Sequence, residues 1–209
     1  MRAKGSGKTR NQRDGGLKPR DFDYKGKVGR PESLKSIKNK AIYDSIMDAI
    51  SRYHSVLGVR DKEIKLATLP SGVGGVHFTR GGESAGIFLN KEIFQPAEAT
   101  TQSVAAWAKA GFDSGHLTKH NRPVAAIILH ELGHATWNEH MTGQKYQDAG
   151  KEIKLMYRHW VQDKGKENYG RYAATNVSEF WAEVSAKAVS GFRDRYTDGV
   201  KRVISKYGL

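Results

Sequence analysis

The segment 124-VAAIILHELGH-134 carries the strongest structural signal in this chain. Its apolar run from Val124 to Leu129 is typical of a helix that is buried on all sides. Asn121 can cap such a helix, and Pro123 then stands in the first turn, where proline is favoured. The sequence therefore predicts a buried helix that begins near Asn121 and runs on through His134.

The end of this helix, His130-Glu131-Leu132-Gly133-His134, has the spacing H-E-x-x-H. At 3.6 residues per turn, His130 and His134 share one face, so both imidazoles can bind one zinc ion. Glu131 is one step round the helix, where its carboxylate can take a proton from a bound water and later deliver it to a leaving amine. The alternative, a pair of surface histidines, does not explain why these polar groups follow directly on a buried apolar run.

A catalytic zinc site needs a third protein ligand, and the sequence offers two candidates. His140 stands at the spacing H-E-x-x-H-x-x-G-x-x-H of the metzincins, but Trp137 replaces the glycine that turns the chain there. If the helix continues, His140 lies roughly 280° round the axis from His130 and points away from the metal. His140 would then be a polar residue at a helix end, near the negative end of the helix dipole.

The second candidate is Glu179, in the helical segment 176-NVSEFWAEV-184. Glu179 and Glu183 are four residues apart and share one face of an otherwise apolar helix, where carboxylates need partners. A zinc ion and its histidines would be suitable partners. Glu179 could instead complete a capping box with Asn176, but a carboxylate bound to zinc cannot also fold back to the cap.

The HELGH segment and the downstream segment 172-YAATNVSEFWAE-183 together resemble the gluzincin metallopeptidases, in particular the catalytic domain of anthrax lethal factor and its relatives. The resemblance covers residues 124 to 188 in outline. It implies a zincin-like domain in which Glu179 is the third zinc ligand and Tyr172 faces the metal. It also puts Glu183 where related enzymes have a carboxylate that orients a zinc histidine.

This resemblance implies a zinc-dependent endopeptidase that hydrolyses peptide bonds of a protein or peptide substrate. The zinc ligands would be His130, His134 and Glu179, with Glu131 as general base and then acid. Tyr172 would donate a hydrogen bond to the developing oxyanion. The alternatives are a core tyrosine at position 172 and a surface glutamate at position 183.

A second group with a similar pattern suggests a different function. The antirestriction metallopeptidases of mobile elements pair H-E-L-x-H with Y-A-x-x-E-L-x-A-E and have an N-terminal region that binds single-stranded DNA. This chain has three extra residues between Tyr172-Ala173 and the glutamate. The alternative function is therefore an antirestriction-type or virion-associated nucleic-acid-binding protein whose zincin domain has low or no proteolytic activity.

The remaining periodicity predicts a mixed fold. Apolar residues at helical spacing indicate a helix from Pro31 to Gly58. Short strands are expected at 63–69, 76–79 and 86–89, and a further helix at 98–110. The fold class is therefore α+β: a zincin-like metallopeptidase with a small, mostly antiparallel sheet, an active-site helix carrying HExxH and a C-terminal helical part. The strand from Gly86 to Asn90 is expected to be the edge that holds a substrate backbone by strand addition, with an ordinary internal strand as the alternative.

Positive charge is concentrated at the N-terminus. The formal net charge is +13, of which residues 1–40 carry +9. Residues 1–30 have only Leu17, Phe22, Tyr24 and Val28 as sizeable apolar groups, so they are expected to form a basic extended arm ahead of a domain at 31–209. Such an arm could bind nucleic acid or an acidic partner protein, or could simply be a solvated tail.

Other classes of protein are excluded by composition. The chain has no cysteine, which removes disulfide scaffolds, thiolate metal sites and cysteine nucleophiles. It has no apolar run of the roughly 18–20 residues that a membrane span needs, and Met1 to Arg13 lacks the apolar stretch of a signal peptide. We therefore expect no membrane partner and a cytoplasmic, virion-associated or host-delivered protein. Small size, a basic arm and the lack of cysteine would suit a phage or mobile element.

Overall fold

The computed structural model describes residues 31–58, 63–80, 83–115, 117, 120–137, 147–163 and 169–208. Its elements follow in the order β1 (Glu32–Ser33), η2 (Leu34–Ser36), α2 (Lys40–Leu57), β2 (Ile64–Ala67), β3 (Gly75–Arg80), β4 (Glu83–Asn90), α3 (Lys91–Phe94), α4 (Thr101–Asp113), η3 (Pro123–Ala125), α5 (Ala126–Thr136), α6 (Gln147–Gln162), η6 (Tyr172–Ala174), α8 (Val177–Val189) and α9 (Arg195–Tyr207). The fold is α+β and mostly helical, so the predicted fold class is confirmed at this level. The basic arm at 1–30 lies outside the described residues, and its extended form stays a prediction.

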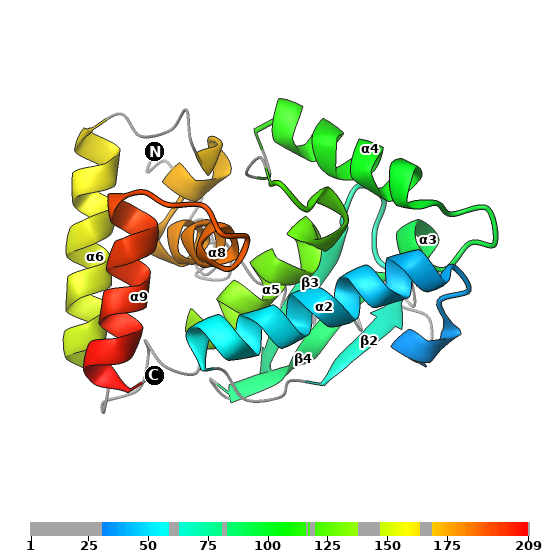
Figure 1. The fold of residues 1–209 in the computed structure, drawn as a ribbon, viewed down its shortest axis with the longest axis horizontal. Helices are drawn as coiled ribbons and strands as arrows, with labels where there is room; N and C mark the ends of the chain where they lie inside the picture. The colour runs from blue at the N-terminus through cyan, green and yellow to red at the C-terminus, as the bar shows by residue number, and fades with distance from the viewer. Residues whose placement is uncertain are drawn as a thin grey trace, which may run out of the picture.

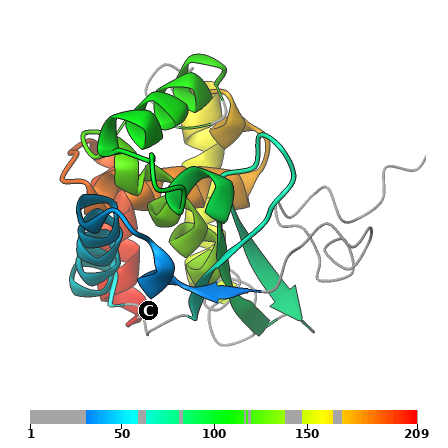
Figure 2. The same ribbon diagram turned by 90° about the vertical axis from the view of Figure 1, so that its right-hand side faces the viewer.

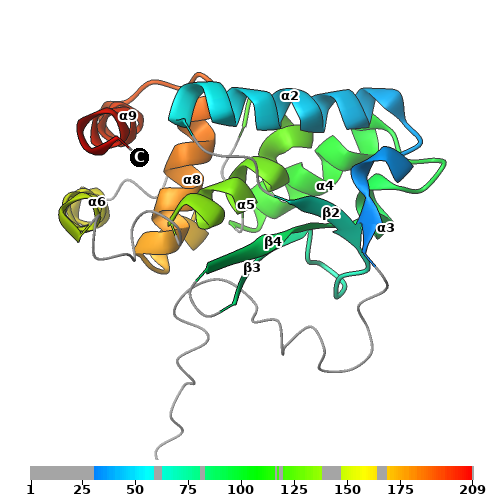
Figure 3. The ribbon, with the colours of Figure 1, turned by 90° about the horizontal axis from the view of Figure 1, so that it is seen from below.

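The elements form layers around α5. The small sheet lies on one side of α5 and α2 lies on the other (Figure 3). Helix α8 packs against α5, and α6 and α9 pack beyond α8 (Figure 1). The end-on view shows the strands gathered on one side of the helices (Figure 2). Helix α5 is thus covered from several directions, and every residue in it is buried, as its apolar sequence predicts.

The sheet has the strand order β1-β2-β4-β3. Strands β1 and β2 are antiparallel, as are β3 and β4, whereas the central pair β2 and β4 is parallel. The prediction of a small, mostly antiparallel sheet is therefore confirmed, with one parallel pair that it did not include.

The prediction that the strand from Gly86 to Asn90 is a sheet edge is wrong. That segment belongs to β4, which lies between β2 and β3. Its side chains show why: Ile87 and Leu89 pack in the main core with the helices, while Phe88 packs in a second apolar cluster with Val76 and Phe78 of β3. A strand that is apolar on both faces is typical of a sheet interior. The edge strand beside the helices is β3.

The first helix begins later than predicted. Glu32 and Ser33 form the short strand β1, and α2 begins at Lys40 instead of near Pro31. The reason is the cap: the Asn39 side chain accepts hydrogen bonds from the backbone N–H groups of Ala41 and Ile42, which stabilises a helix start at this point. The predicted end is confirmed, because Gly58 takes the left-handed conformation with φ of 64°.

The predicted starts of α4 and of the HExxH helix α5 also differ from the observed starts. Helix α4 starts at Thr101, three residues later than predicted at its N-terminus, because Thr100 and Ser103 form a capping box. Asn121 does not cap the HExxH helix. That helix is preceded by the 3-10 turn η3, in which Pro123 stands near the start and no side chain provides a capping hydrogen bond.

The C-terminal helical part is confirmed, and aromatic packing holds it together. Phe180 of α8 lies with its ring centroid 5.2 Å from that of Trp160 of α6 and 6.0 Å from that of Tyr196 of α9. Tyr169 completes this cluster at 6.4 Å from Phe180. Because these rings are buried, α8 is fixed between α5 on one side and the pair α6 and α9 on the other.

Candidate metal centre

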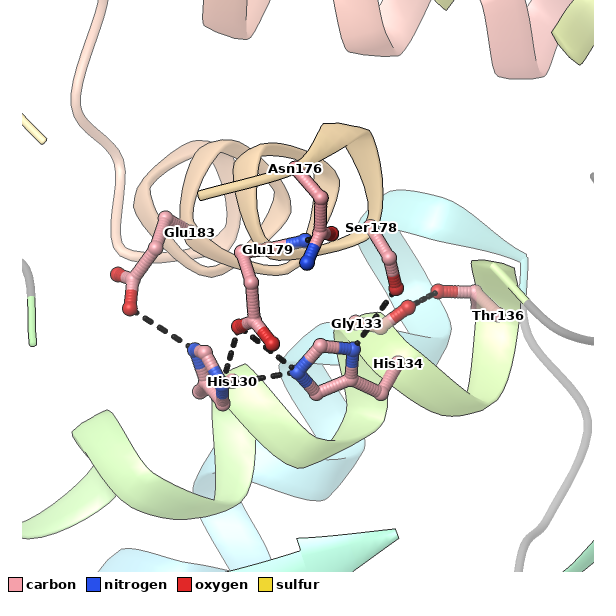
Figure 4. Close-up of polar contacts among 8 residues, drawn as sticks. All are labelled: His130, Gly133, His134, Thr136, Asn176, Ser178, Glu179 and Glu183. Carbon is pink, nitrogen blue, oxygen red and sulfur yellow. Dashed lines mark hydrogen bonds and ion pairs between the residues drawn. The ribbon is translucent and has the colours of Figure 1, made fainter. Parts of the chain in front are cut away.

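Two histidines of α5 face one another at the centre of the molecule. His130 and His134 are one turn apart, as their spacing predicts, and their Nε2 atoms lie 3.0 Å from each other (Figure 4). The rings are nearly perpendicular, with centroids 4.6 Å apart. Both Nε2 atoms therefore point into the same small space.

Glu179 of α8 reaches into that space from the neighbouring helix. Its Oε2 atom lies 3.1 Å from Nε2 of His134 and 3.4 Å from Nε2 of His130. The three residues offer ligand atoms that lie within 4.8 Å of one another. They are almost completely buried, at 6%, 3% and 0% exposure for His130, His134 and Glu179. The two histidines and this glutamate, which the sequence singles out from separate segments, are thus brought together.

A close approach of the two helices makes this meeting possible. A Cβ atom added to Gly133 would lie 2.5 Å from Cα of Ala182 and 3.0 Å from its Cβ. Only glycine permits α5 and α8 to touch here without a side chain between them. The contact lies between the two histidines of α5 and opposite the segment of α8 that carries Glu179, so the ligands can face each other at hydrogen-bonding distance.

The other nitrogen of each histidine has a partner on α8. Nδ1 of His130 lies 2.8 Å from Oε1 of Glu183, and Nδ1 of His134 lies 3.1 Å from the Ser178 hydroxyl (Figure 4). The contact of Glu183 agrees with the role that the resemblance implies. A neutral histidine that donates its Nδ1 proton to such a partner has a lone pair on Nε2, which here would be directed at the shared space. Ser178 was missed by sequence reasoning, although its place directly before Glu179 puts it on the adjacent face of the same helix.

Helix α8 is capped by Asn176 without the help of the Glu179 side chain. Oδ1 of Asn176 accepts a hydrogen bond from the backbone N–H of Glu179 at 2.9 Å, so Asn176 is the N-cap of α8. The Glu179 side chain does not fold back to complete a capping box, because its carboxylate is turned to the histidines. The backbone of Glu179 therefore takes part in the cap of α8, while its side chain takes part in the polar cluster.

The donor set fits a metal ion. Burial works against the charged form of Glu179, but the charges of the two histidines and their hydrogen bonds outweigh it and lower its pKa to about 2. Its Oε1 atom is buried without a hydrogen-bond partner among the described residues. An ionised carboxylate with an unused oxygen, beside two imidazoles that each offer an Nε2 lone pair once they release their extra proton, is a set of donors that a cation would satisfy. These three residues could hold a metal ion.

Glu131 lies beside the cluster and against the edge strand. Its pKa is raised, first because the carboxyl is buried and further by the negative charge of Glu179, although the histidines act in the opposite direction. The backbone of His77 in β3 hydrogen-bonds the carboxylate. A Cβ on Gly75 would lie 3.0 Å from Cγ of Glu131, so this strand passes close to the side chain. Neither Gly75 nor His77 was predicted to be near the site.

Tyr172 also lies close to His130. The residue opens the short turn η6, and its ring centroid is 6.3 Å from that of His130. Its hydroxyl approaches the Glu179 carboxylate, and its pKa is raised first by burial and then by the charges of Glu179 and Glu131. Tyr172 therefore faces the cluster and does not belong to the aromatic core around Tyr169.

His140, the rival ligand, lies outside the described residues. The chain does not turn where a metzincin glycine would turn it, because Trp137 keeps helical dihedral angles of φ −57° and ψ −50°. Helix α5 ends at Thr136, and residues 138–146 lie outside the described part of the chain, so the position of His140 stays a prediction. His116, another histidine ahead of α5, is also outside the described residues.

Comparisons with protein-family models, with curated proteins and with solved structures found no match to this chain. Functional arguments therefore rest on the chain's own residues. None of the helices in the described ranges combines the length and apolar character required to cross a membrane.

Proposed function

We propose that this chain is a zinc-dependent endopeptidase of the gluzincin type, with a zincin-like fold, that hydrolyses peptide bonds of a protein substrate. The observation that carries the proposal is the convergence of His130, His134 and Glu179, with Glu131 beside them at the open edge of a sheet. When bound by these three ligands, zinc would polarise the scissile carbonyl and lower the pKa of a water to roughly 7.

Glu131 is the proposed general base. It is buried next to the histidines but is not one of the three clustered ligands, so its carboxylate is available to accept a proton from the attacking water. Its raised pKa supports a second role as the acid that protonates the leaving amine. The His77 backbone contact fixes the carboxylate between the ligands and β3.

Strand β3 supplies a surface for an extended substrate. The N–H of Asn90 bonds the carbonyl of Gly74, so in the antiparallel ladder residues 74, 76 and 78 face β4. The backbone groups of Gly75 and His77 therefore point away from β4, on the side where Glu131 lies. A peptide that adds to this edge would have its backbone next to the proposed base, which is the mode of strand addition.

Two other residues would support the reaction. Tyr172 faces the cluster with a neutral hydroxyl, since its pKa is raised, and could donate a hydrogen bond to the developing oxyanion. Glu183 would hold His130 in the tautomer and orientation that a ligand needs.

The test compares the wild-type protein with Glu131→Gln on a proteome-derived peptide library, after loading both with Zn²⁺. The substitution keeps the shape of the side chain and removes the base. We expect equal zinc content and cleavage that falls by about a hundredfold or more in the variant. Equal cleavage by both proteins would show that Glu131 is not the base. The absence of cleavage by both, with zinc bound, would favour the alternative of a binding protein with an inactive zincin domain.

A further inference from the structure

Helices α5 and α8 share a second buried polar contact, centred on the hydroxyl of Thr136. The indole Nε1 of Trp181 donates a hydrogen bond to Thr136 Oγ1 at 3.1 Å. The Tyr53 hydroxyl of α2 lies 2.9 Å from the same oxygen. Thr136 Oγ1 in turn donates to the backbone carbonyl of Gly133 at 2.7 Å. All three side chains are buried, so this contact is shielded from water.

The Thr136 hydroxyl uses its whole hydrogen-bonding capacity in this arrangement. A hydroxyl has one donor and two acceptor positions. Its proton goes to a helix carbonyl, and its two lone pairs receive the protons of Trp181 and Tyr53. Because each group is buried and satisfied, any displacement of α8 relative to α5 would leave a buried N–H without a partner.

The contact lies on the opposite flank of the helix crossing from the metal ligands. The crossing is centred on Gly133 and Ala182. At about 100° per residue, His134 lies to one side of Gly133 and Thr136 about 60° to the other side. On α8, Glu179 lies about 60° to one side of Ala182 and Trp181 about 100° to the other. The crossing thus has a ligand flank and a Thr136–Trp181 flank.

The crossing itself cannot fix how α8 is rotated. Gly133 has no side chain, and Ala182 has only a methyl group, so no side chains interlock at the centre of the crossing, and the rotation of α8 depends on contacts to either side of it. Glu179 and Trp181 are two residues apart on one rigid helix. A rotation that carries Glu179 away from the histidines must therefore also break the hydrogen bond between Trp181 and Thr136.

We propose that Thr136 and Trp181 are positioning residues for the metal centre: their hydrogen bond sets the rotation of α8 on α5 and so presents Glu179 to the Nε2 atoms of His130 and His134. This inference rests on the proposed metal-dependent function. Tyr53 reaches the same oxygen from α2, and it neither carries a proposed ligand nor takes part in the hydrogen bond between Trp181 and Thr136, so it provides the control.

The test measures metal affinity and ligand geometry apart from stability. Thr136→Val keeps the shape of residue 136 but removes the hydroxyl, and Trp181→Phe removes the indole N–H. We expect each to weaken Zn²⁺ binding by about tenfold to a hundredfold in competition with a chelator. Each should also change the visible absorption spectrum of the Co²⁺-loaded protein, which reports the ligand geometry. Thr136→Ser, which keeps the hydroxyl, should restore both readouts.

The control separates positioning from a general loss of stability. Tyr53→Phe should lower the melting temperature of the metal-free protein but leave the Zn²⁺ affinity and the Co²⁺ spectrum close to those of the wild type. Circular dichroism establishes that each variant is folded. The proposal is overturned if Thr136→Val and Trp181→Phe bind Zn²⁺ as the wild type does, or if Tyr53→Phe weakens binding equally. If the wild-type protein binds no metal, both the proposed function and this inference fail. If the wild-type protein binds Zn²⁺ and the variants Thr136→Val and Trp181→Phe bind it equally well, only this inference fails.

Discussion

Gly133 of α5 touches Ala182 of α8 so closely that a Cβ at position 133 would lie 2.5 Å from the Ala182 Cα atom. The approach involves the backbone of α8 and not the end of a flexible side chain, so neither helix can yield locally. The distance between the helices, and with it the distance between Glu179 and the histidines, therefore depends on the absence of a side chain at residue 133.

Gly133→Ala should force α5 and α8 apart. We expect an overpacking cost of about 1–3 kcal/mol in the free energy of unfolding of the metal-free protein, together with a loss of zinc affinity, measured by urea denaturation and chelator competition. Gly111→Ala is the matched control, because the three atoms nearest its Cβ outside its own helix would all be side-chain atoms of Leu117, of which Cδ1 is closest at 2.9 Å. That variant should be nearly neutral or slightly stabilised, since alanine favours a helix more than glycine does. Similar losses in both variants would argue against the close approach as the cause.

The proposed metal ligands can be tested by measuring the zinc content of the protein and of its variants. We expect native mass spectrometry to find one zinc ion per wild-type chain, because the three clustered residues define one site. Glu179→Ala should lower the zinc affinity strongly, since it removes a ligand. His140→Ala should leave it unchanged. The reverse pair of results would mean that His140 is the third ligand and that the chain turns after Trp137.

Ser178 offers a prediction that the sequence alone did not contain. Its hydroxyl lies 3.1 Å from Nδ1 of His134, so Ser178→Ala should remove the hydrogen-bond partner that orients this nitrogen. We expect zinc affinity to fall by about tenfold to a hundredfold, with little change in helix content by circular dichroism. Ser190→Ala, at the C-cap of the same helix, serves as the control, because its hydroxyl contacts His120 and neither of the two histidines of the cluster. Equal affinities for the two variants would remove Ser178 from the site.

The burial of Lys187 leads us to expect that the free energy of unfolding depends on pH. Its side chain is only 4% exposed, and its ammonium lies 4.4 Å and 4.0 Å from the ring centroids of Tyr169 and Phe192. Burial lowers the pKa of this lysine, although the carboxylates of Asp194 and Glu183 act in the opposite direction. His120, whose pKa burial lowers to about 4, also interacts with this ammonium electrostatically.

A lysine whose pKa is lower in the folded state than in the unfolded state binds more protons when unfolded. Its contribution to stability is therefore least favourable below the folded pKa and improves as pH rises towards the unfolded value near 10.5. Relative to Lys187→Met, the wild-type protein should gain unfolding free energy between pH 7 and pH 10. Urea denaturation of both proteins across that range measures the difference. A difference that stays constant or shrinks with pH would contradict the lowered pKa.

The sequence was most informative where local pattern and chemistry agree. The apolar run before His130 predicted a buried helix, the four-residue spacing predicted two histidines on one face, and Gly58 predicted a helix end. Glu179 was singled out because a carboxylate on an apolar helix needs a partner, and the resemblance of its segment to a known family supported that choice; Tyr172 was singled out from the resemblance alone. The cluster itself shows that Glu179 reaches the histidines.

The errors concern features that local pattern does not determine. The position of β4 inside the sheet depends on a parallel pairing with β2, which joins segments that are separated by another strand. The starts of α2 and α4 depend on which polar residue captures the free N–H groups, and several nearby residues could do so. Ser178 and the contact of His77 with Glu131 arise only when two elements pack together, so no spacing rule indicates them.

The distance along the chain between His134 and Glu179, 45 residues, has a consequence for folding kinetics. Two of the proposed ligands lie on one helix, but the third is in place only when α8 has docked on α5, and we expect this long-range docking to follow the transition state for folding. A bound ion would then stabilise the native state more than the transition state for folding. Metal should therefore lower the unfolding rate and leave the folding rate almost unchanged. The metal-loaded protein would then be kinetically stable, because its activation barrier to unfolding is high.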